Sequence, residues 1–181
     1  MWFLLIVAVV AVWLVVIYNG LVRLRVRADG AWSDINVQLK RRYDLIPNIV
    51  EAVRGYATHE KTLFVQVTTA RSLAMQANGP KEKGNAEGML ATSLKTLFAV
   101  AENYPELKAN QNFMSLQQSL TNVEDALQNS RRYYNAVVRD YNTQCQQVPT
   151  SLIATMAGFT SKEFFQLESS EEAKAPKVSF S

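Results

Sequence analysis

The feature that most constrains this chain is the run of apolar residues near its start. Residues 2–18 read WFLLIVAVVAVWLVVIY, without a charge or a proline, and the apolar character continues through Val22. Roughly 21 helical residues, at about 1.5 Å each, match the hydrocarbon core of a bilayer, which is about 30 Å thick. A cleaved signal peptide would carry a basic stretch before the run and a small-residue cleavage site after it, and neither is seen. The sequence therefore predicts a retained transmembrane anchor over residues 1–22.

Basic residues follow the apolar run, and none precedes it. They are Arg23, Arg25, Arg27, Lys40, Arg41 and Arg42, against only Asp29 and Asp34 in the same stretch. The positive-inside rule then places the amino terminus outside and the remainder of the chain in the cytoplasm. The arginines near the span are also expected to attract anionic headgroups, at about 1 kcal/mol each, or simply to solvate a helix face. These two interpretations are compatible.

The remainder of the chain is predicted to be helical, since only seven glycines occur in 181 residues and 48% of the residues are apolar. Apolar residues recur every three or four positions from Trp32, and this stripe extends to about Gln76. Pro47 interrupts it and leaves two alternatives. Either the proline kinks one long helix, or a new helix begins near Asp44 and the part before it folds back as an additional bundle helix.

Two further apolar stripes follow a predicted loop at Asn78-Gly79-Pro80. The first ends near Pro105. The second is the most regular in the chain and is expected to end before Pro149; its ten positions are Phe113, Leu116, Leu120, Val123, Leu127, Ser130, Tyr134, Val137, Tyr141 and Cys145. Because Cys145 lies on this stripe, we expect a buried, unreactive thiol. The prediction is an all-α fold, in which the transmembrane helix continues into an antiparallel up-and-down bundle of long helices.

The bundle is predicted to occupy residues 23–167. Near its end, Phe159, Phe164 and Phe165 are expected to pack aromatic rings across one end of the bundle. Residues 168–181 are rich in Ser, Glu, Ala and Lys and offer little to bury, so we predict a flexible tail.

Residue types that carry chemistry are scarce. His59 and Cys145 are the only residues of their kinds, which rules out an intrachain disulfide and a multi-histidine metal site. His59-Glu60 begins like a zinc-protease helix, but Leu63 stands where the second histidine is needed. The glycines at 79, 84 and 88 match no phosphate-binding loop. We therefore predict no enzyme activity, no cofactor and no metal, and the dispersed basic residues predict no nucleic-acid binding.

Two polar concentrations are candidates for contact with a partner. Around Pro47 lie Arg41, Arg42, Asp44, Asn48 and Glu51, which suit a charged tail or a headgroup, or else only cap the helix and form ion pairs within it. Arg131 and Arg132 begin the motif RRYYN, which is either a binding face or a lock against Asp44 or Glu51 on a neighbouring helix. With Arg23, Arg25 and Arg27, these are the candidate partner-contact or lipid-contact residues.

Two blocks of sequence resemble a known family. They read YNGLVRLRVRADGAWSDINVQLKRRYDLIPNIVEAVRGYATHE and RRYYNAVVRDYNTQCQQVPTSLIATMAGFTSKEFF. They are similar to the LemA family of bacterial membrane proteins, to which the magnetosome protein MamQ is related. The resemblance covers essentially the whole chain. It implies one amino-terminal membrane segment, or a lipoprotein anchor in its place, ahead of a helical bundle.

The resemblance has two departures and one conflict. Gly30 and Asn36 stand where acidic residues are common in the family, and Gly30 is expected to loosen its helix by about 1 kcal/mol relative to alanine. The bodies of lipoprotein relatives lie outside the cytoplasm, whereas the charges of this chain predict a cytoplasmic body in the bacterial inner membrane.

Three classes of function are considered. The leading one is a non-enzymatic, membrane-anchored helical scaffold or adaptor that self-associates, in part through coiled-coil-like helices, and contacts the lipid bilayer and other membrane proteins. The alternative is a sensor of membrane or envelope stress, or a signalling adaptor, that transmits through a helix hinged at Pro47. An enzyme such as a protease or hydrolase would have to depend on His59.

Overall fold

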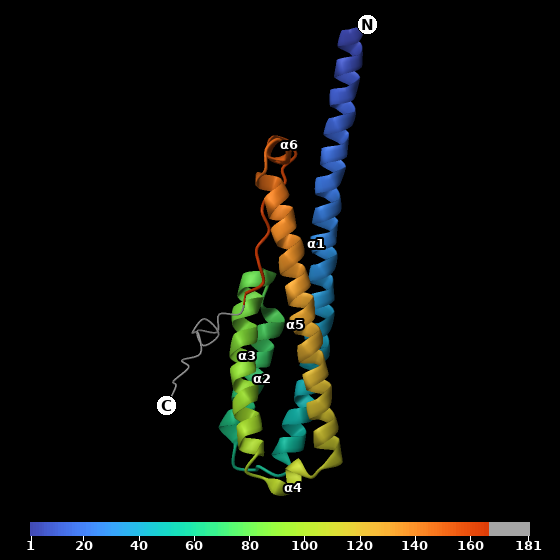
Figure 1. Cartoon of the computed structure of the whole chain (residues 1–181). Helices are drawn as coiled ribbons and strands as arrows, with labels where there is room; N and C mark the ends of the chain where they lie inside the picture. The colour runs from blue at the N-terminus through green and yellow to red at the C-terminus, as the bar shows by residue number, and fades with distance from the viewer. Residues whose placement is uncertain (167–181) are drawn as a thin grey trace, which may run out of the picture. The chain divides into compact units, whose positions relative to one another are not determined.

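In a computed structural model of the chain, the described residues, 1–166, form six helices and contain no strand (Figure 1). The predicted all-α class is confirmed. The helices are α1 (Trp2–Arg54), α2 (Lys61–Gln76), α3 (Gly79–Ala101), α4 (Pro105–Lys108), α5 (Gln111–Gln146) and α6 (Thr150–Met156). The described residues group into two compact units: Met1–Lys40 with Val123–Phe164, and Arg41–Asn122 with Phe165 and Gln166. Both α1 and α5 contribute to each unit.

Helix α1 is a single helix of 53 residues, and Pro47 lies inside it. The alternative of a new helix that begins near Asp44 is therefore wrong, and the chain does not fold back at Pro47. A proline removes one backbone donor, here the N–H that would reach the carbonyl of Tyr43. That carbonyl instead accepts a hydrogen bond of 2.8 Å from Nε of Arg71 on α2. A side chain from the neighbouring helix thus replaces the missing bond.

The start of α1 is apolar and uncovered. Residues 2–16 are all exposed, and α1 alone among the described helices is long and apolar enough to cross a membrane. Exposed apolar side chains on a 15-residue stretch of helix are not a stable surface in water. The feature therefore agrees with the predicted anchor.

The first unit is built from α1, the second part of α5, and α6. All ten positions of the predicted α5 stripe are buried or half-buried, and α5 ends at Gln146, before Pro149, as the periodicity indicates. Trp32 of α1 packs against Tyr134 of α5, with ring centroids 5.3 Å apart. Cys145 is half-buried, so the expectation of a fully buried thiol is too strong.

The second unit contains the end of α1, helices α2, α3 and α4, and the start of α5. The stripe expected to continue to Gln76 is interrupted, because α1 ends at Arg54 and residues 55–60 form a turn before α2. The predicted loop at Asn78-Gly79-Pro80 is shorter than expected. Gly79 has a positive φ of 74°, and Pro80 fits the first turn of α3, where its missing N–H costs nothing.

Candidate membrane and partner surfaces

The arginines that follow the apolar run are all exposed. Arg23, Arg25 and Arg27 are two residues apart, so neighbouring ones point about 200° away from each other around α1. Arg23 and Arg27, four residues apart, therefore share one face of α1, and Arg25 lies on the other side. Cations on two sides of a helix that leaves a bilayer suit contact with lipid headgroups.

Four of the five candidate residues around Pro47 lie on one exposed face of α1. Arg41, Asp44, Asn48 and Glu51 follow one another at spacings of three and four residues. We call this face the α1 polar stripe. Glu51 also pairs with Arg54, at 3.4 Å, within the same helix. The stripe carries both signs of charge, so it suits a polar partner surface as well as simple solvation.

The fifth, Arg42, lies in the core of the second unit. Only 3% of Arg42 and none of Glu87 is exposed, and Nη1 of Arg42 lies 2.5 Å from Oε2 of Glu87 on α3. The hydroxyl of Tyr43 donates to the other carboxylate oxygen of Glu87 and also lies 3.1 Å from the carbonyl of Ala74. Burial, together with the hydrogen bond to Glu87, raises the pKa of Tyr43 above its ordinary value.

This buried cluster changes the role of Arg42. Its guanidinium is committed to Glu87 inside the bundle and does not face a headgroup or a partner. Sequence reasoning missed Glu87 and Tyr43. A signal was present, because Glu87 stands three residues before Leu90 on the apolar stripe of α3, where a charge needs a buried partner.

The second polar concentration is split by the fold. Arg131 is half-buried, whereas Arg132 is exposed and donates a hydrogen bond of 2.6 Å to Oδ1 of Asn129 in its own helix. Tyr134 is buried, and its hydroxyl donates to the carbonyl of Glu163 at 2.9 Å. The motif RRYYN therefore contributes partly to the core and partly to the surface.

The segment after α6 is fastened to the first unit by side chains that the sequence did not single out. The side-chain amide of Asn142 makes two hydrogen bonds with the backbone of Lys162, at 2.8 and 2.9 Å. The hydroxyl of Tyr141 donates to Thr160 at 3.0 Å, and Nζ of Lys162 lies 2.7 Å from Asp29. Of the three phenylalanines expected to pack across one end of the bundle, Phe159 packs against Tyr18 in this unit and Phe164 is exposed, whereas Phe165 is buried and belongs to the second unit.

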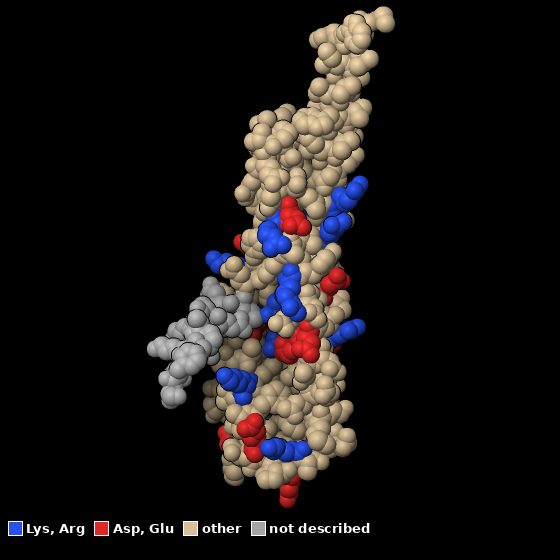
Figure 2. Space-filling view, in the orientation of Figure 1, with Lys and Arg blue, Asp and Glu red and all other residues tan. Residues whose placement is uncertain are grey.

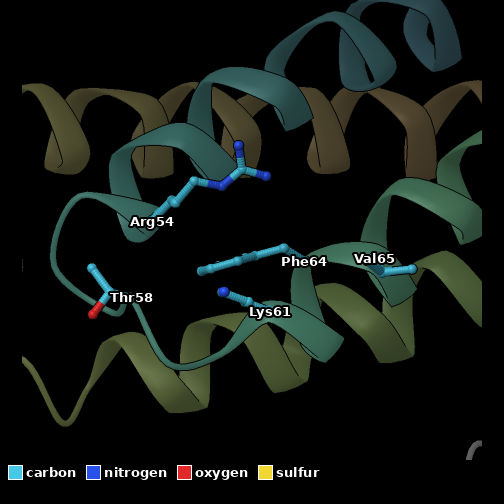
Figure 3. Close-up of a pocket in the computed structure, with 5 residues that line it drawn as sticks. All are labelled: Arg54, Thr58, Lys61, Phe64 and Val65. Atoms are coloured by element: carbon cyan, nitrogen blue, oxygen red, sulfur yellow. The ribbon is translucent and has the colours of Figure 1, made fainter.

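A shallow pocket of about 410 Å³ lies beside the turn between α1 and α2 (Figure 3). Cζ of Arg54 lies 5.4 Å from the centroid of the Phe64 ring, and Lys61 points to the opposite side of that ring. Thr58 adds a hydroxyl. Two cations beside an aromatic face suit an anionic side chain of a partner, although Glu51 already neutralises part of the charge on Arg54.

The same turn contains His59, which is exposed and not on a helix. Among residues 1–166, no group of three His, Cys, Asp or Glu side chains is placed to hold a metal ion.

An apolar groove of about 480 Å³ runs between α2 and α3. Val65 and Leu73 on α2 and Met89 on α3 line it, and roughly half or more of each of these residues is exposed. These three exposed apolar side chains make the groove a candidate for contact with another protein.

These features define a class: a membrane-associated helical protein whose apolar first helix continues into a helical bundle. The chain belongs to the LemA family, whose pattern it matches over residues 31–180. It is similar to the magnetosome protein MamQ 2 of Paramagnetospirillum magneticum, with 26% identity over 82% of this chain and 64% of the relative. The MamQ protein of Magnetospirillum gryphiswaldense is 25% identical over the same shares, and the LemA protein of Metamycoplasma hominis is 23% identical over 82% of this chain and 68% of its own length. The chain thus spans just under two thirds of the length of the MamQ relatives.

Proposed function

We propose that this protein is a single-pass, membrane-anchored scaffold or adaptor without enzyme activity, which binds copies of itself and other membrane proteins. The observation that carries the proposal is the exposed apolar start of α1, which continues without a break into a packed helical body. The α1 polar stripe and the groove between α2 and α3 support a binding role. The arginines at 23, 25 and 27 after the apolar run support an amino terminus outside the inner membrane and a body in the cytoplasm.

Membrane insertion is tested by placing charges in the middle of the span. The double variant Val9→Asp/Val12→Asp should lose membrane attachment, because each charge near the centre of a bilayer costs about 2.5–3.5 kcal/mol on an insertion scale. The wild-type chain and a matched Val9→Ile/Val12→Ile variant should stay in carbonate-washed membranes. Wild-type protein in the soluble fraction would overturn the anchor.

Orientation is tested by thiol labelling. In a Cys145→Ser background, Lys95→Cys introduces one thiol at an exposed position of α3. An impermeant maleimide should label it only after the inner membrane has been permeabilised. Labelling in spheroplasts with an intact inner membrane would place the body outside the cytoplasm.

Self-association and partner binding are tested in cells. Crosslinking of the tagged full-length protein, followed by mass spectrometry, should recover copies of the chain or other membrane proteins. A strict monomer by light scattering in detergent, with no crosslinked neighbour in the cell, would contradict the scaffold proposal.

The alternative, a sensor or signalling adaptor, is favoured by one observation. Helix α1 is continuous from the apolar run to the buried Arg42–Glu87 pair. One continuous helix could therefore transmit a movement of the span to the core of the second unit. Spin labels at Arg41→Cys and Glu51→Cys flank Pro47. If the protein is a sensor, the distance between the two labels should differ between detergent and vesicles. An unchanged distance would contradict the sensor alternative.

A further inference from the structure

A second apolar surface lies beside the end of the apolar run. We define the α6 hairpin as residues 147–159, which leave α5, form α6 and turn back. Its Phe159 packs edge-on against Tyr18 of α1, with ring centroids 5.7 Å apart. On α1, Ile17 and Gly20 are half-buried and Leu21 is only 1% exposed, whereas residues 2–16 are all exposed. The body of the first unit therefore begins to cover α1 at about Ile17.

The length of the span places this contact relative to a bilayer. The charge-free part of α1, Trp2–Val22, measures about 31 Å, close to the roughly 30 Å of a hydrocarbon core. Its uncovered part, residues 2–16, measures only about 22 Å. A bilayer that covers the whole apolar run must therefore extend about 9 Å further, to the level at which the α6 hairpin meets α1.

The hairpin has the composition that such a position requires. No charged residue occurs between Asp140 and Lys162. Val148, Leu152 and Met156 project their apolar side chains outward, with 82%, 66% and 90% of their surfaces exposed. Figure 2 shows the α6 region and the adjoining start of α1 as one surface without charged side chains, and the first coloured residues appear below it.

Backbone groups are costly in an apolar medium unless they are hydrogen-bonded. In the hairpin, donors on both sides of α6 bond locally: Ser151 N–H to Gln147, Leu152 N–H to Pro149, Ala157 N–H to Ile153, Gly158 N–H to Thr155 and Phe159 N–H to Ala154. The hydroxyl of Thr155 also donates to the carbonyl of Ser151, at 2.9 Å. These bonds lower the cost of moving the hairpin out of water.

We propose that the α6 hairpin is a second membrane contact, which enters the boundary between headgroups and acyl chains beside α1. Leu152 and Met156 face lipid there, and the polar but uncharged residues of the hairpin lie at headgroup level. A depth of about 9 Å is within the 5–10 Å typical of interfacial helices. The inference rests on the proposed span of α1, whose membrane insertion is measured separately in the same experiment.

The test uses the full-length Cys145→Ser protein in phosphatidylethanolamine–phosphatidylglycerol vesicles. Three variants each carry a single spin label: at Met156→Cys in the hairpin, at Val9→Cys in the span or at Lys95→Cys in the body. Collision rates of each label with oxygen, which concentrates in lipid, and with a water-soluble nickel chelate give its depth. All three positions are exposed, so the substitutions leave the packing intact. The oxygen-to-nickel ratio at Met156 should lie between the high ratio at Val9 and the low ratio at Lys95.

The outcomes separate the two proposals. A ratio at Met156 equal to that at Lys95, with a high ratio at Val9, would leave the span in place and overturn the hairpin contact. Low accessibility to both reagents at Met156 would indicate a protein partner or a second copy over the hairpin, and would also overturn it. A low ratio at Val9 would overturn the membrane span itself.

Discussion

At the scale of single residues, two charges that fall on apolar stripes define the core of the second unit. Arg42 is in step with Leu39 and Ile46 on α1, and Glu87 is in step with Leu90 and Leu94 on α3. Each would be costly to bury alone. They meet in the core, so each satisfies the charge of the other.

Removal of one partner of this pair should destabilise the fold. Glu87→Ala leaves the Arg42 guanidinium buried without its carboxylate, and breaking a buried pair in this way costs about 3–5 kcal/mol. Urea denaturation in detergent measures the loss. Glu102→Ala, at an exposed position near the end of the same helix, should change stability by less than about 0.5 kcal/mol. The apolar replacement Arg42→Met/Glu87→Leu should recover most of the stability; a double variant as unstable as Glu87→Ala would contradict this interpretation.

Two glycines of α3 should respond differently to alanine. A Cβ at Gly84 would lie 1.9 Å from the carbonyl oxygen of Gln166, whereas a Cβ at Gly88 would meet nothing within 4 Å. Gly88→Ala should stabilise the protein by about 0.5–1 kcal/mol, because alanine is the better helix former. Gly84→Ala gains the same propensity but displaces the chain at Gln166, so its denaturation midpoint should fall below that of Gly88→Ala. Equal midpoints would show that the contact at Gly84 yields without cost.

At the scale of helices, the replacement of a backbone bond by Arg71 explains how α1 passes through Pro47. In the wild type, Arg71→Ala leaves the Tyr43 carbonyl without its donor, a loss of about 1.5–3 kcal/mol for a hydrogen bond from a charged group. In a Pro47→Ala background, the restored N–H of residue 47 serves that carbonyl. The effect of Arg71→Ala should then be smaller. A double-mutant cycle by urea denaturation measures the coupling, and additive effects would refute it.

The helices themselves were largely predictable from their periodicity. The ten regular positions of α5 and the proline that follows it predict both its existence and its end. The turn at residues 55–60 was missed, because Val53, Tyr56 and Leu63 suggest one continuous apolar stripe; Val53 and Leu63 are buried in the fold, whereas Tyr56 is exposed. Gly55 was the only local signal. A periodic stripe therefore does not distinguish one helix from two that bury the same side.

The candidate surfaces were less predictable. Exposure of the α1 polar stripe follows from spacing alone, because its residues avoid the apolar register. The partnership of Arg42 with Glu87 joins positions 45 residues apart and depends on which helices are neighbours. The same is true of Asn142 with Lys162, which requires that the chain turn back after α6.

At the scale of the whole molecule, each unit buries a tyrosine whose neutral form the fold favours. Burial, helped by the charges of Asp29 and Glu163, raises the pKa of Tyr134 to about 12, and that of Tyr43 is raised as well. In the unfolded chain a tyrosine has a pKa of about 10. Above pH 10 the unfolded state therefore releases protons that the folded state retains, so stability is highest below that pH and falls as the pH rises.

The loss of folding stability at alkaline pH should depend on these tyrosine hydroxyls. Between pH 8 and pH 11, Tyr134 alone should lower the free energy of unfolding of the wild type by about 1.4 kcal/mol. The free energy of unfolding of Tyr134→Phe should therefore fall by about 1.4 kcal/mol less than that of the wild type over the same interval. Urea denaturation at the two pH values measures the difference. Tyr133→Phe, at an exposed neighbouring position, is the control and should behave like the wild type. An unchanged alkaline slope in Tyr134→Phe would contradict the assignment.

The absence of any linker between the apolar run and the rest of α1 has a consequence for encounters between molecules. In a chain anchored as proposed, the distance of a residue from the bilayer along an unbroken helix follows from its position, and Arg41 comes 19 residues after Val22. Copies inserted in one membrane would thus carry their α1 polar stripes in a common layer. Their search for one another would be confined to two dimensions, and a binding partner would have to offer its matching groups at that same distance from the lipid.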